Sequence, residues 1–151
     1  MMRTHQGPIL VVEDHADDVM LIRRAFQKAK VLCPLVVVED GDSAVDYLQG
    51  TGNYADPHAH PLPVLVLLDL KLPRRSGLEV LEWLRQQPSL RALPVVILTS
   101  SKENADIKRA YELGANTYLS KPVEFDALLE IVKTLNLYWL VMAEQPVVQR
   151  P

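Results

Sequence analysis

Short runs of consecutive apolar residues constrain the fold of this chain more than any other feature of its sequence. Each run is rich in valine, isoleucine or leucine and shows no alternation with polar residues. Continuous apolar strands are typical of parallel sheets that helices cover on both faces. The runs predict five strands of one buried sheet, of which the last is the weakest: Ile9–Val12, Leu35–Val38, Val64–Leu68, Val95–Leu98 and Tyr118–Leu119.

Segments with the period of a helix separate these runs. In each segment, apolar residues return every three or four positions and so share one helical face. Strands that alternate with helices imply right-handed crossovers and an α/β fold with a doubly wound parallel sheet. The helical faces contain Val19, Ile22, Phe26 and Ala29; a short stretch near Ser43–Gln49; Leu78, Leu81 and Leu84; Ile107, Ala110 and Tyr111; and Phe125 to Leu135.

Local signals at helix ends and in loops complete the predicted organisation. The polar segment Gly50–Pro63 predicts an elongated loop before the third strand. We expect an N-terminal extension at residues 1–8, one domain at 9–142 and a frayed C-terminal tail at 143–151. The expected N-caps are Ser43, Ser76 and Ser101, and Gly114 is expected to stop the fourth helix.

Charge and cysteine content exclude several classes of function. The 151 residues carry a formal net charge of −3, without the basic surplus typical of proteins that bind nucleic acid. The single cysteine, Cys33, has no partner for an internal disulfide. Met1–Pro8 lacks the apolar run of a signal peptide, and Val64–Leu68 is too short to span a bilayer. We therefore expect a soluble cytoplasmic protein without nucleic-acid or membrane partners.

Polar residues follow the predicted strands at the edge where open α/β sheets bind ligands. Glu13–Asp14 end the first strand, and Asp69 ends the third. If these strands are neighbours, the three carboxylates converge and would raise one another's pKa unless a cation intervenes. Mg²⁺ would compensate them, because it binds carboxylates and phosphate oxygens.

A hydroxyl and an amine stand at the same edge, since Thr99 ends the fourth strand and Lys121 follows the fifth. A carboxylate nucleophile, a metal, a lysine and a hydroxyl together can stabilise a phosphoryl group during transfer. The sequence therefore predicts that Asp69 accepts phosphate and that Lys121 and Thr99 hold the product.

These segments, in this order, resemble the receiver domain of two-component response regulators. The acidic pair follows an apolar strand, Asp69 is followed by Pro73 and Gly77, and the segment Tyr118–Pro122 ends in Ser-Lys-Pro. The resemblance runs from about Ile9 to about Leu140. It implies a flavodoxin-like (βα)5 fold with strand order 2-1-3-4-5, a requirement for Mg²⁺, and phosphate supplied by a sensor histidine kinase.

The resemblance also implies roles for single residues. Thr99 and Tyr118 would move together as switch residues when Asp69 is phosphorylated. The signal would leave through the surface of the fourth helix, the fifth strand and the fifth helix. Ser100 stands where many receivers have alanine, which still leaves room for a phosphoryl group. The implied metal ligands are Asp14, Asp69 and the backbone carbonyl of Lys71, with Glu13 acting through water.

The long loop and the extended last helix resemble a subgroup of stand-alone receivers, some of which work with phytochrome-type photoreceptor kinases. In this helix, Leu137–Val141 adds five apolar residues in a row, more than one helical face of a small domain can bury. Such clusters commonly mark interaction sites. We expect a symmetric homodimer through the face of the fourth helix, the fifth strand and the fifth helix with its C-terminal extension, and Tyr138 or Trp139 near the contact. The alternative is that the extension folds back over its own domain.

Simpler interpretations stay open for each residue taken alone. Asp69 could cap a loop, and Glu13 could only shape the local field. Thr99 could make a local backbone bond, and Tyr118 could serve packing alone. Lys121 could be an ordinary surface lysine. The residues expected to face solvent without a role are His5, His15, His58 and His60, and also Arg74 and Arg75, for which partner docking is the alternative.

Three other functions fit the same fold class less well. A haloacid dehalogenase-type phosphohydrolase needs a second aspartate two residues after the nucleophile, where this chain has Lys71. A scaffold that is never phosphorylated would not need Asp14, Asp69, Thr99 and Lys121 together. A flavin carrier would need a phosphate-cradling loop where this chain has Glu13–Asp14.

Overall fold

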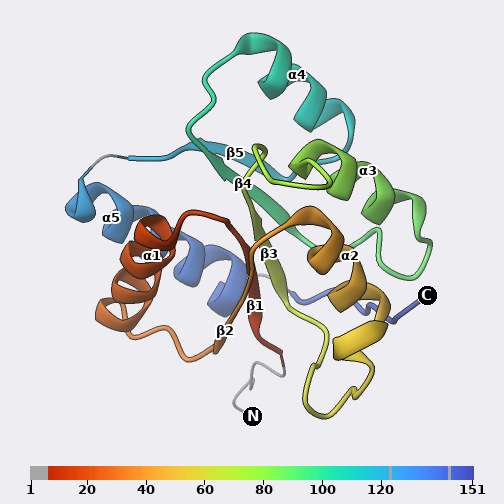
Figure 1. Ribbon diagram of the computed structural model, residues 1–151. Coiled ribbons are helices and arrows are strands. Elements are labelled where there is room, and N and C mark those ends of the chain that lie inside the picture. Colours follow the sequence, from red (N-terminus) through yellow and green to blue (C-terminus); the bar gives the residue numbers. More distant parts are fainter. Residues whose placement is uncertain (1–6, 123, 143) are drawn as a thin grey trace.

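Five parallel strands form a single sheet in the order β2-β1-β3-β4-β5 (Figure 1). The structure is a computed structural model that describes residues 7–122, 124–142 and 144–151. The order and the parallel pairing confirm the predicted flavodoxin-like fold. The strands are β1 (Ile9–Val12), β2 (Leu35–Val38), β3 (Leu65–Leu68), β4 (Val95–Thr99) and β5 (Thr117–Ser120).

Helices cover both faces of the sheet, as the continuous apolar strands predicted. Helices α1 (Ala16–Lys28) and α5 (Phe125–Leu135) pack together on one face. Helices α2 (Gly41–Gln49), α3 (Gly77–Gln86) and α4 (Asn104–Glu112) lie on the other face (Figure 1).

Alternate residues of the central strands serve the two layers, because successive side chains of a strand point to opposite faces. Val12 and Leu68 belong to the core under α2 and α3. Val11 and Leu67 belong to the core under α1 and α5. All four side chains are buried. Both faces of β1 and β3 are therefore closed to water, and polar groups are left to the strand ends.

Two of the three predicted N-caps are wrong. Ser76 caps α3 as expected and accepts a hydrogen bond from the amide of Glu79 at 3.2 Å. Helix α2 is capped by Asp40, whose carboxylate accepts the Ser43 amide at 2.7 Å. Ser101 lies three residues before α4, whose N-cap residue is Glu103, and its hydroxyl donates to Asp106 in the first turn of that helix at 2.6 Å. Gly114 follows α4 with a positive φ of 99°, as a helix stop requires.

The segment Gly50–Pro63 is an elongated loop with one 3₁₀ turn, η1 (Gly52–Tyr54). It is anchored to α2, because the rings of Tyr54 and His60 pack against Tyr47. His60 is thus partly covered, whereas His58 is exposed as predicted. His5 lies outside the described residues, as does most of the N-terminal extension.

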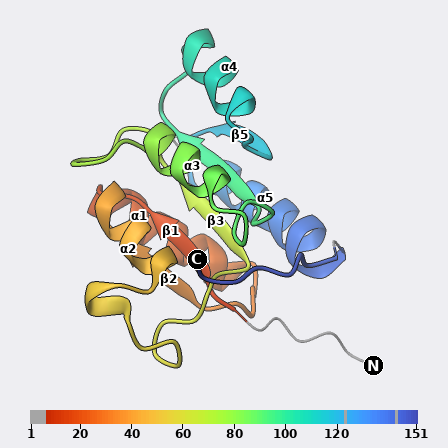
Figure 2. The same ribbon diagram turned by 90° about the vertical axis from the view of Figure 1, so that its right-hand side faces the viewer.

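The C-terminal tail is not frayed, which corrects the prediction for residues 144–151. Figure 2 shows it running back from the end of the last helical segment across the domain. Arg150 donates hydrogen bonds to the carbonyls of Tyr47 and His60, and Gln149 donates to Ser89. Val148 packs against the core. The tail thus covers the amino ends of the strands, here called the amino edge of the sheet, beside α2 and α3.

The last helix continues beyond α5 as a π-helical segment, η2 (Asn136–Met142). Leu140 is buried in the core of its own domain, and Trp139 is partly buried against the same core. Leu137 and Tyr138 are 58% and 57% exposed. Part of the apolar extension is therefore packing, and part of it remains on the surface.

Candidate functional site

The predicted site residues converge at the carboxyl edge of the sheet. Val12 of β1 stands opposite Leu68 of β3, so Glu13 and Asp14 leave β1 directly beside Asp69. The amide of Asp69 donates to the carbonyl of Val12 at 3.1 Å and fixes this register. Neighbouring parallel strands thus bring three carboxylates to one point, as their places at the strand ends predicted.

Asp69 is buried, with 3% of its surface exposed, and its two oxygens have separate partners. Thr99 donates to one oxygen at 2.6 Å, and Lys121 donates to the other at 2.8 Å. The amide of Lys71 adds a longer bond of 3.3 Å. Burial acts to raise the pKa of Asp69, but the bonds from Lys121 and Thr99 outweigh it and hold the pKa below its ordinary value. Asp69 is therefore an anion at neutral pH.

Lys121 is the cation of the site and pairs with three carboxylates. It contacts Glu13 and Asp69 and reaches Asp18 of α1 at 2.9 Å. Burial acts to lower the pKa of Lys121, but the hydrogen bonds to these carboxylates raise it well above the ordinary lysine value. Its backbone amide donates to the carbonyl of Thr99 at 2.8 Å, which sets the start of the loop after β5. Lys121 is therefore not an ordinary surface lysine.

Glu13 lies inside the site, with 2% of its surface exposed. Its carboxylate accepts the backbone amide of His15 at 3.1 Å and pairs with Lys121. Burial raises the pKa of Glu13, and the bonds from Lys121 and His15 offset this only in part. The pKa values of Glu13 and Asp69 are therefore shifted in opposite directions. Hydrogen bonds compensate fully for the burial of the Asp69 carboxylate and only in part for that of Glu13.

The donor set at this edge fits a divalent cation. Glu13, Asp14, His15 and Asp69 each offer one ligand atom, and these four atoms lie within 4.8 Å of one another. Three of the four are carboxylate oxygens, the ligands that hard divalent cations prefer. Asp14 is exposed, so the cluster is open to solvent on one side. The ligand role of the Lys71 carbonyl stays a prediction.

The loop that follows Asp69 is held against two helix starts. A Cβ atom on Gly77 would lie 2.1 Å from the carbonyl oxygen of Asp69, so only glycine allows this close approach. Arg75 donates to Asp42 of α2 at 3.1 Å, which corrects the expectation that it only faces solvent. Arg74 is 70% exposed, as expected. The loop position of Asp69 is thus fixed by steric contact with α3 and a charge pair with α2.

A chain of hydrogen bonds leads from Thr99 toward α4 and β5. The amide of Ser101 approaches the Thr99 hydroxyl at 3.5 Å. The Tyr118 hydroxyl donates to the carbonyl of Ser101 at 2.9 Å, and the Ser101 hydroxyl donates to Asp106 of α4 at 2.6 Å. Tyr118 also packs against the core. Tyr118 therefore both packs against the core and is linked to Thr99 through Ser101.

Sequence reasoning missed three residues of this edge. Asp18 pairs with Lys121, and the ring of His15 lies close to Glu13 and Asp14. Ser101 contacts Thr99 through its amide. His15 is 63% exposed, as expected, yet its ring nitrogen Nδ1 lies 3.2 Å from Glu13. The spacing of Asp18, four residues after Asp14 at the start of a helix, was the one available signal for it.

The sequence model described as "Response regulator receiver domain" matches residues 9–133. This chain therefore belongs to the family of response regulator receiver domains. No helix among the described residues is long and apolar enough to cross a membrane.

Several relatives match nearly the whole chain. The probable methanogenesis regulatory protein FilR2 of Methanothrix harundinacea is 40% identical and aligns over 91% of this chain and 86% of its own. The response regulator Rcp1 of Synechocystis is 36% identical over 91% of this chain and 92% of its own.

Solved structures show the same likeness. The Mn²⁺-bound form of Rcp1 matches with a TM-score of 0.84 and 35% identity over 93% of this chain and 99% of that one. The phosphorylated cyanobacterial phytochrome response regulator RcpA matches with a TM-score of 0.86 and 37% identity over 94% and 99%. The chain is thus similar to response regulators that include a phytochrome-associated member.

Proposed function

We propose that this protein is a phosphorylation switch in which Asp69 accepts a phosphoryl group from a histidine kinase in a reaction that requires Mg²⁺. The observation that supports this most strongly is the setting of Asp69. Its two oxygens are bound separately by Lys121 and Thr99, beside carboxylates that can share a divalent cation. A receiver domain is a phosphoacceptor module rather than a conventional enzyme, and the protein takes part in its own phosphorylation and dephosphorylation.

The lowered pKa of Asp69 keeps its carboxylate ready to act as a nucleophile. One oxygen forms a bond to phosphorus while the bond between phosphorus and the donor's imidazole nitrogen breaks, and the donor histidine leaves as the neutral base after taking up a proton. Lys121 and Thr99, which now bind the two carboxylate oxygens, then turn to the oxygens of the phosphoryl group. Each donor is already within hydrogen-bond distance of one oxygen of the reacting carboxylate, so little reorganisation is needed.

The proposed metal ligands are Asp14, Asp69 and the carbonyl of Lys71, with Glu13 acting through water. A bound Mg²⁺ supplies positive charge that neutralises the carboxylates and the incoming phosphate oxygens. The Mn²⁺-bound form of the relative Rcp1 supports a divalent cation in this family. Lys121 balances part of the same negative charge from the side of β5.

The signal leaves through α4, β5 and α5. When Thr99 turns toward the phosphoryl group, its contact with the amide of Ser101 changes. Ser101 binds Tyr118 through its carbonyl and Asp106 through its hydroxyl, so β5 and the first turn of α4 follow. Thr99 and Tyr118 are therefore the proposed switch pair.

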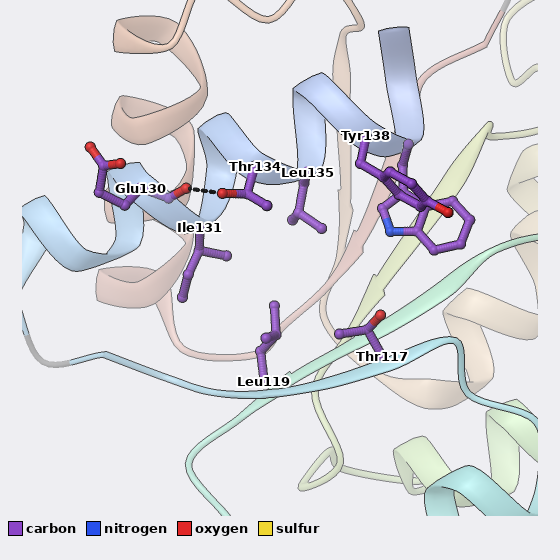
Figure 3. Close-up of a pocket in the computed structure, with 8 residues that line it drawn as sticks. Thr117, Leu119, Glu130, Ile131, Thr134, Leu135 and Tyr138 are labelled. Atoms are coloured by element: carbon purple, nitrogen blue, oxygen red, sulfur yellow. Dashed lines mark hydrogen bonds between the residues drawn. The ribbon is translucent and has the colours of Figure 1, made fainter. Parts of the chain in front are cut away.

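The same surface is the proposed contact with partners. Between β5 and α5 lies a groove of about 400 Å³ that is lined in part by the exposed Tyr138, and Leu137, the preceding residue, is exposed as well. Figure 3 shows Ile131 and Leu135 of α5 above Leu119 and Thr117 of β5. An apolar groove next to exposed apolar residues supports a homodimer through this face and η2.

The donor is proposed to be a sensor kinase of the phytochrome type, because the relative RcpA is a phytochrome response regulator. We place this exchange in the cytoplasm. A formal net charge of −3 gives no support for a nucleic-acid partner.

Incubation with acetyl phosphate followed by intact mass spectrometry tests the proposed acceptor. With Mg²⁺ the wild type should gain the mass of one phosphoryl group, and after chelation with EDTA it should gain none. Asp69→Asn should fold and gain none, whereas the control Asp17→Asn, an exposed acid of α1, should behave as the wild type. An equal mass gain in Asp69→Asn contradicts the proposal.

A further inference from the structure

The imidazole of His15 lies against the acidic cluster, and nothing in the function proposed above uses it. Its Nδ1 atom is 3.2 Å from an oxygen of Glu13, 3.4 Å from an oxygen of Asp14 and 3.9 Å from an oxygen of Asp18. The side chain is 63% exposed, so it borders the cluster on its solvent side. The ring is thus the nitrogen donor of a site otherwise built from oxygen, among the described residues.

His15 is the N-cap residue of α1, but its side chain makes no capping hydrogen bond. Serine, threonine, aspartate and asparagine are the usual residues here because their oxygens accept a helix amide. Histidine gives up this stabilisation, and its ring is turned toward the carboxylates instead. The structural role of an N-cap therefore does not account for the direction of the ring.

The distances permit one ion to reach both kinds of donor. The ligand atoms of Glu13, Asp14, His15 and Asp69 lie within 4.8 Å of one another. Opposite ligands of a single ion, each roughly 2.1 Å from it, are about 4.2 Å apart. A movement of a few tenths of an ångström would bring the set together, and in the wild type the metal ion would replace the contact of His15 Nδ1 with Glu13.

From this placement we infer that His15 is a nitrogen ligand of the cation site and shifts its preference toward first-row transition-metal ions such as Mn²⁺ and Co²⁺. This inference rests on the metal site of the proposed function. Mg²⁺ is a hard cation that binds oxygen and keeps its waters, so the ring adds little to its affinity. Imidazole suits transition-metal ions, whose affinity for a mixed nitrogen and oxygen site rises along the series from Mn²⁺ to Co²⁺.

Calorimetric titration of the tag-free full chain with MgCl₂ and CoCl₂ measures the contribution of the ring. His15→Asn removes the nitrogen donor and leaves a good N-cap, so the variant should fold. We expect its affinity for Co²⁺ to fall roughly tenfold, while its affinity for Mg²⁺ changes less than about twofold. The control His58→Asn, an exposed histidine outside the site, should leave both affinities unchanged. Equal effects of His15→Asn on the two metals overturn the inference.

Pulsed electron paramagnetic resonance of the Mn²⁺-loaded chain detects the ligand directly. The wild type and His58→Asn should show coupling of the electron spin to a bound ¹⁴N nucleus, and His15→Asn should lose that coupling. Bound Mn²⁺ without nitrogen coupling in the wild type overturns the role of His15 and leaves the carboxylate site intact. If Asp14→Asn binds Mg²⁺ as tightly as the wild type, the proposed metal site itself is wrong and the inference falls with it.

Discussion

At the carboxyl edge of the sheet Lys121 is held by carboxylates, whereas at the amino edge Arg85 is held by neutral oxygens. Lys121 pairs with Glu13, Asp18 and Asp69. Arg85, near the end of α3, donates five hydrogen bonds to the carbonyls of Arg91, Leu93 and Gly114 and to the side chain of Asn116. Both groups are cations partly removed from water.

The two settings shift the pKa values of Lys121 and Arg85 in opposite directions. Carboxylates raise the pKa of Lys121 despite its burial, whereas burial alone lowers the pKa of Arg85. Neutral carbonyls tie α3 to the loops before β4 and β5 without adding charge. The hydrogen bonds of Arg85 therefore hold the amino edge in place. At the carboxyl edge the ion pairs of Lys121 can be changed by a phosphoryl group or a metal ion.

Lys121→Met should have the largest effect on stability, lowering the free energy of unfolding at pH 7.5 by about 4 kcal/mol. Glu13 and Asp69 are buried and would lose their cation. In the wild type the lowered pKa of Asp69 stabilises the fold above the ordinary aspartate value, and the raised pKa of Lys121 stabilises it below the ordinary lysine value. Urea unfolding followed by circular dichroism measures the difference.

The same variant has a pH signature. Without the lysine, burial raises the pKa of both carboxylates, so the folded state binds protons more tightly than the unfolded state. Part of the lost stability should therefore return between pH 7.5 and pH 5. Lys102→Met, at an exposed position, serves as the control. A loss that is the same at both pH values would mean that packing, rather than charge, explains the carboxyl edge.

Gly77→Ala should cost about 3 kcal/mol, because the added methyl group would overlap the backbone of Asp69. Because Mg²⁺ would bind the folded state, we expect it to raise the melting temperature, and the movement of the loop in this variant should make that rise smaller. Gly52→Ala is a contrasting control, since that glycine has a positive φ and open space around it, whereas Gly77 has no positive φ and little space. A cost for Gly77→Ala no larger than that of the uncrowded Gly52→Ala would show that steric contact with the Asp69 backbone is not the main cause of the loss.

Arg85→Met should cost about 2 kcal/mol, because it leaves several carbonyls at the amino edge without their donor. None of the described partners of Arg85 is a carboxylate, so the loss should be equal at pH 7.5 and pH 5. Urea unfolding at the two pH values measures it. A loss that shrinks at the lower pH would remove the contrast between the two edges.

Arg150→Ala should have the smallest effect, about 1 kcal/mol, because it removes bonds to the carbonyls of Tyr47 and His60 at the end of the chain. Hydrogen exchange near residues 47–61 should become faster, with little change at Asp69. The exposed Arg91 provides the control variant Arg91→Ala. Faster exchange around Asp69 instead would mean that the tail is coupled to the site.

The sheet and the central site residues were predictable because burial on both faces leaves its mark on every strand. Asp69 directly follows such a strand and Thr99 ends one, at positions where a buried polar group costs free energy unless it has a partner. Parallel pairing and the strand order bring the two residues together. The sequence pattern was therefore sufficient to predict those site residues whose positions depend only on the topology of the sheet.

Other contacts depend on the direction of single side chains and were not predictable. Lys121 reaches Asp18 across 103 positions of the sequence, and the direction of the His15 ring has no periodic signal. The tail was expected to be frayed because its sequence offers little that could pack against the domain. In the structure it is anchored by the Arg150 side chain, by the backbone amide of Gln149 and by packing of Val148 against the core.

Chemical mapping of the acyl phosphate tests the central claim most directly. The wild type is incubated with acetyl phosphate and Mg²⁺, reduced with borohydride, digested and sequenced by mass spectrometry. Reduction converts a phosphorylated aspartate to homoserine, and we predict homoserine at position 69 and unmodified aspartate at positions 14 and 18. Homoserine at position 14 or 18 would contradict the account. So would a gain of phosphate mass without homoserine at position 69.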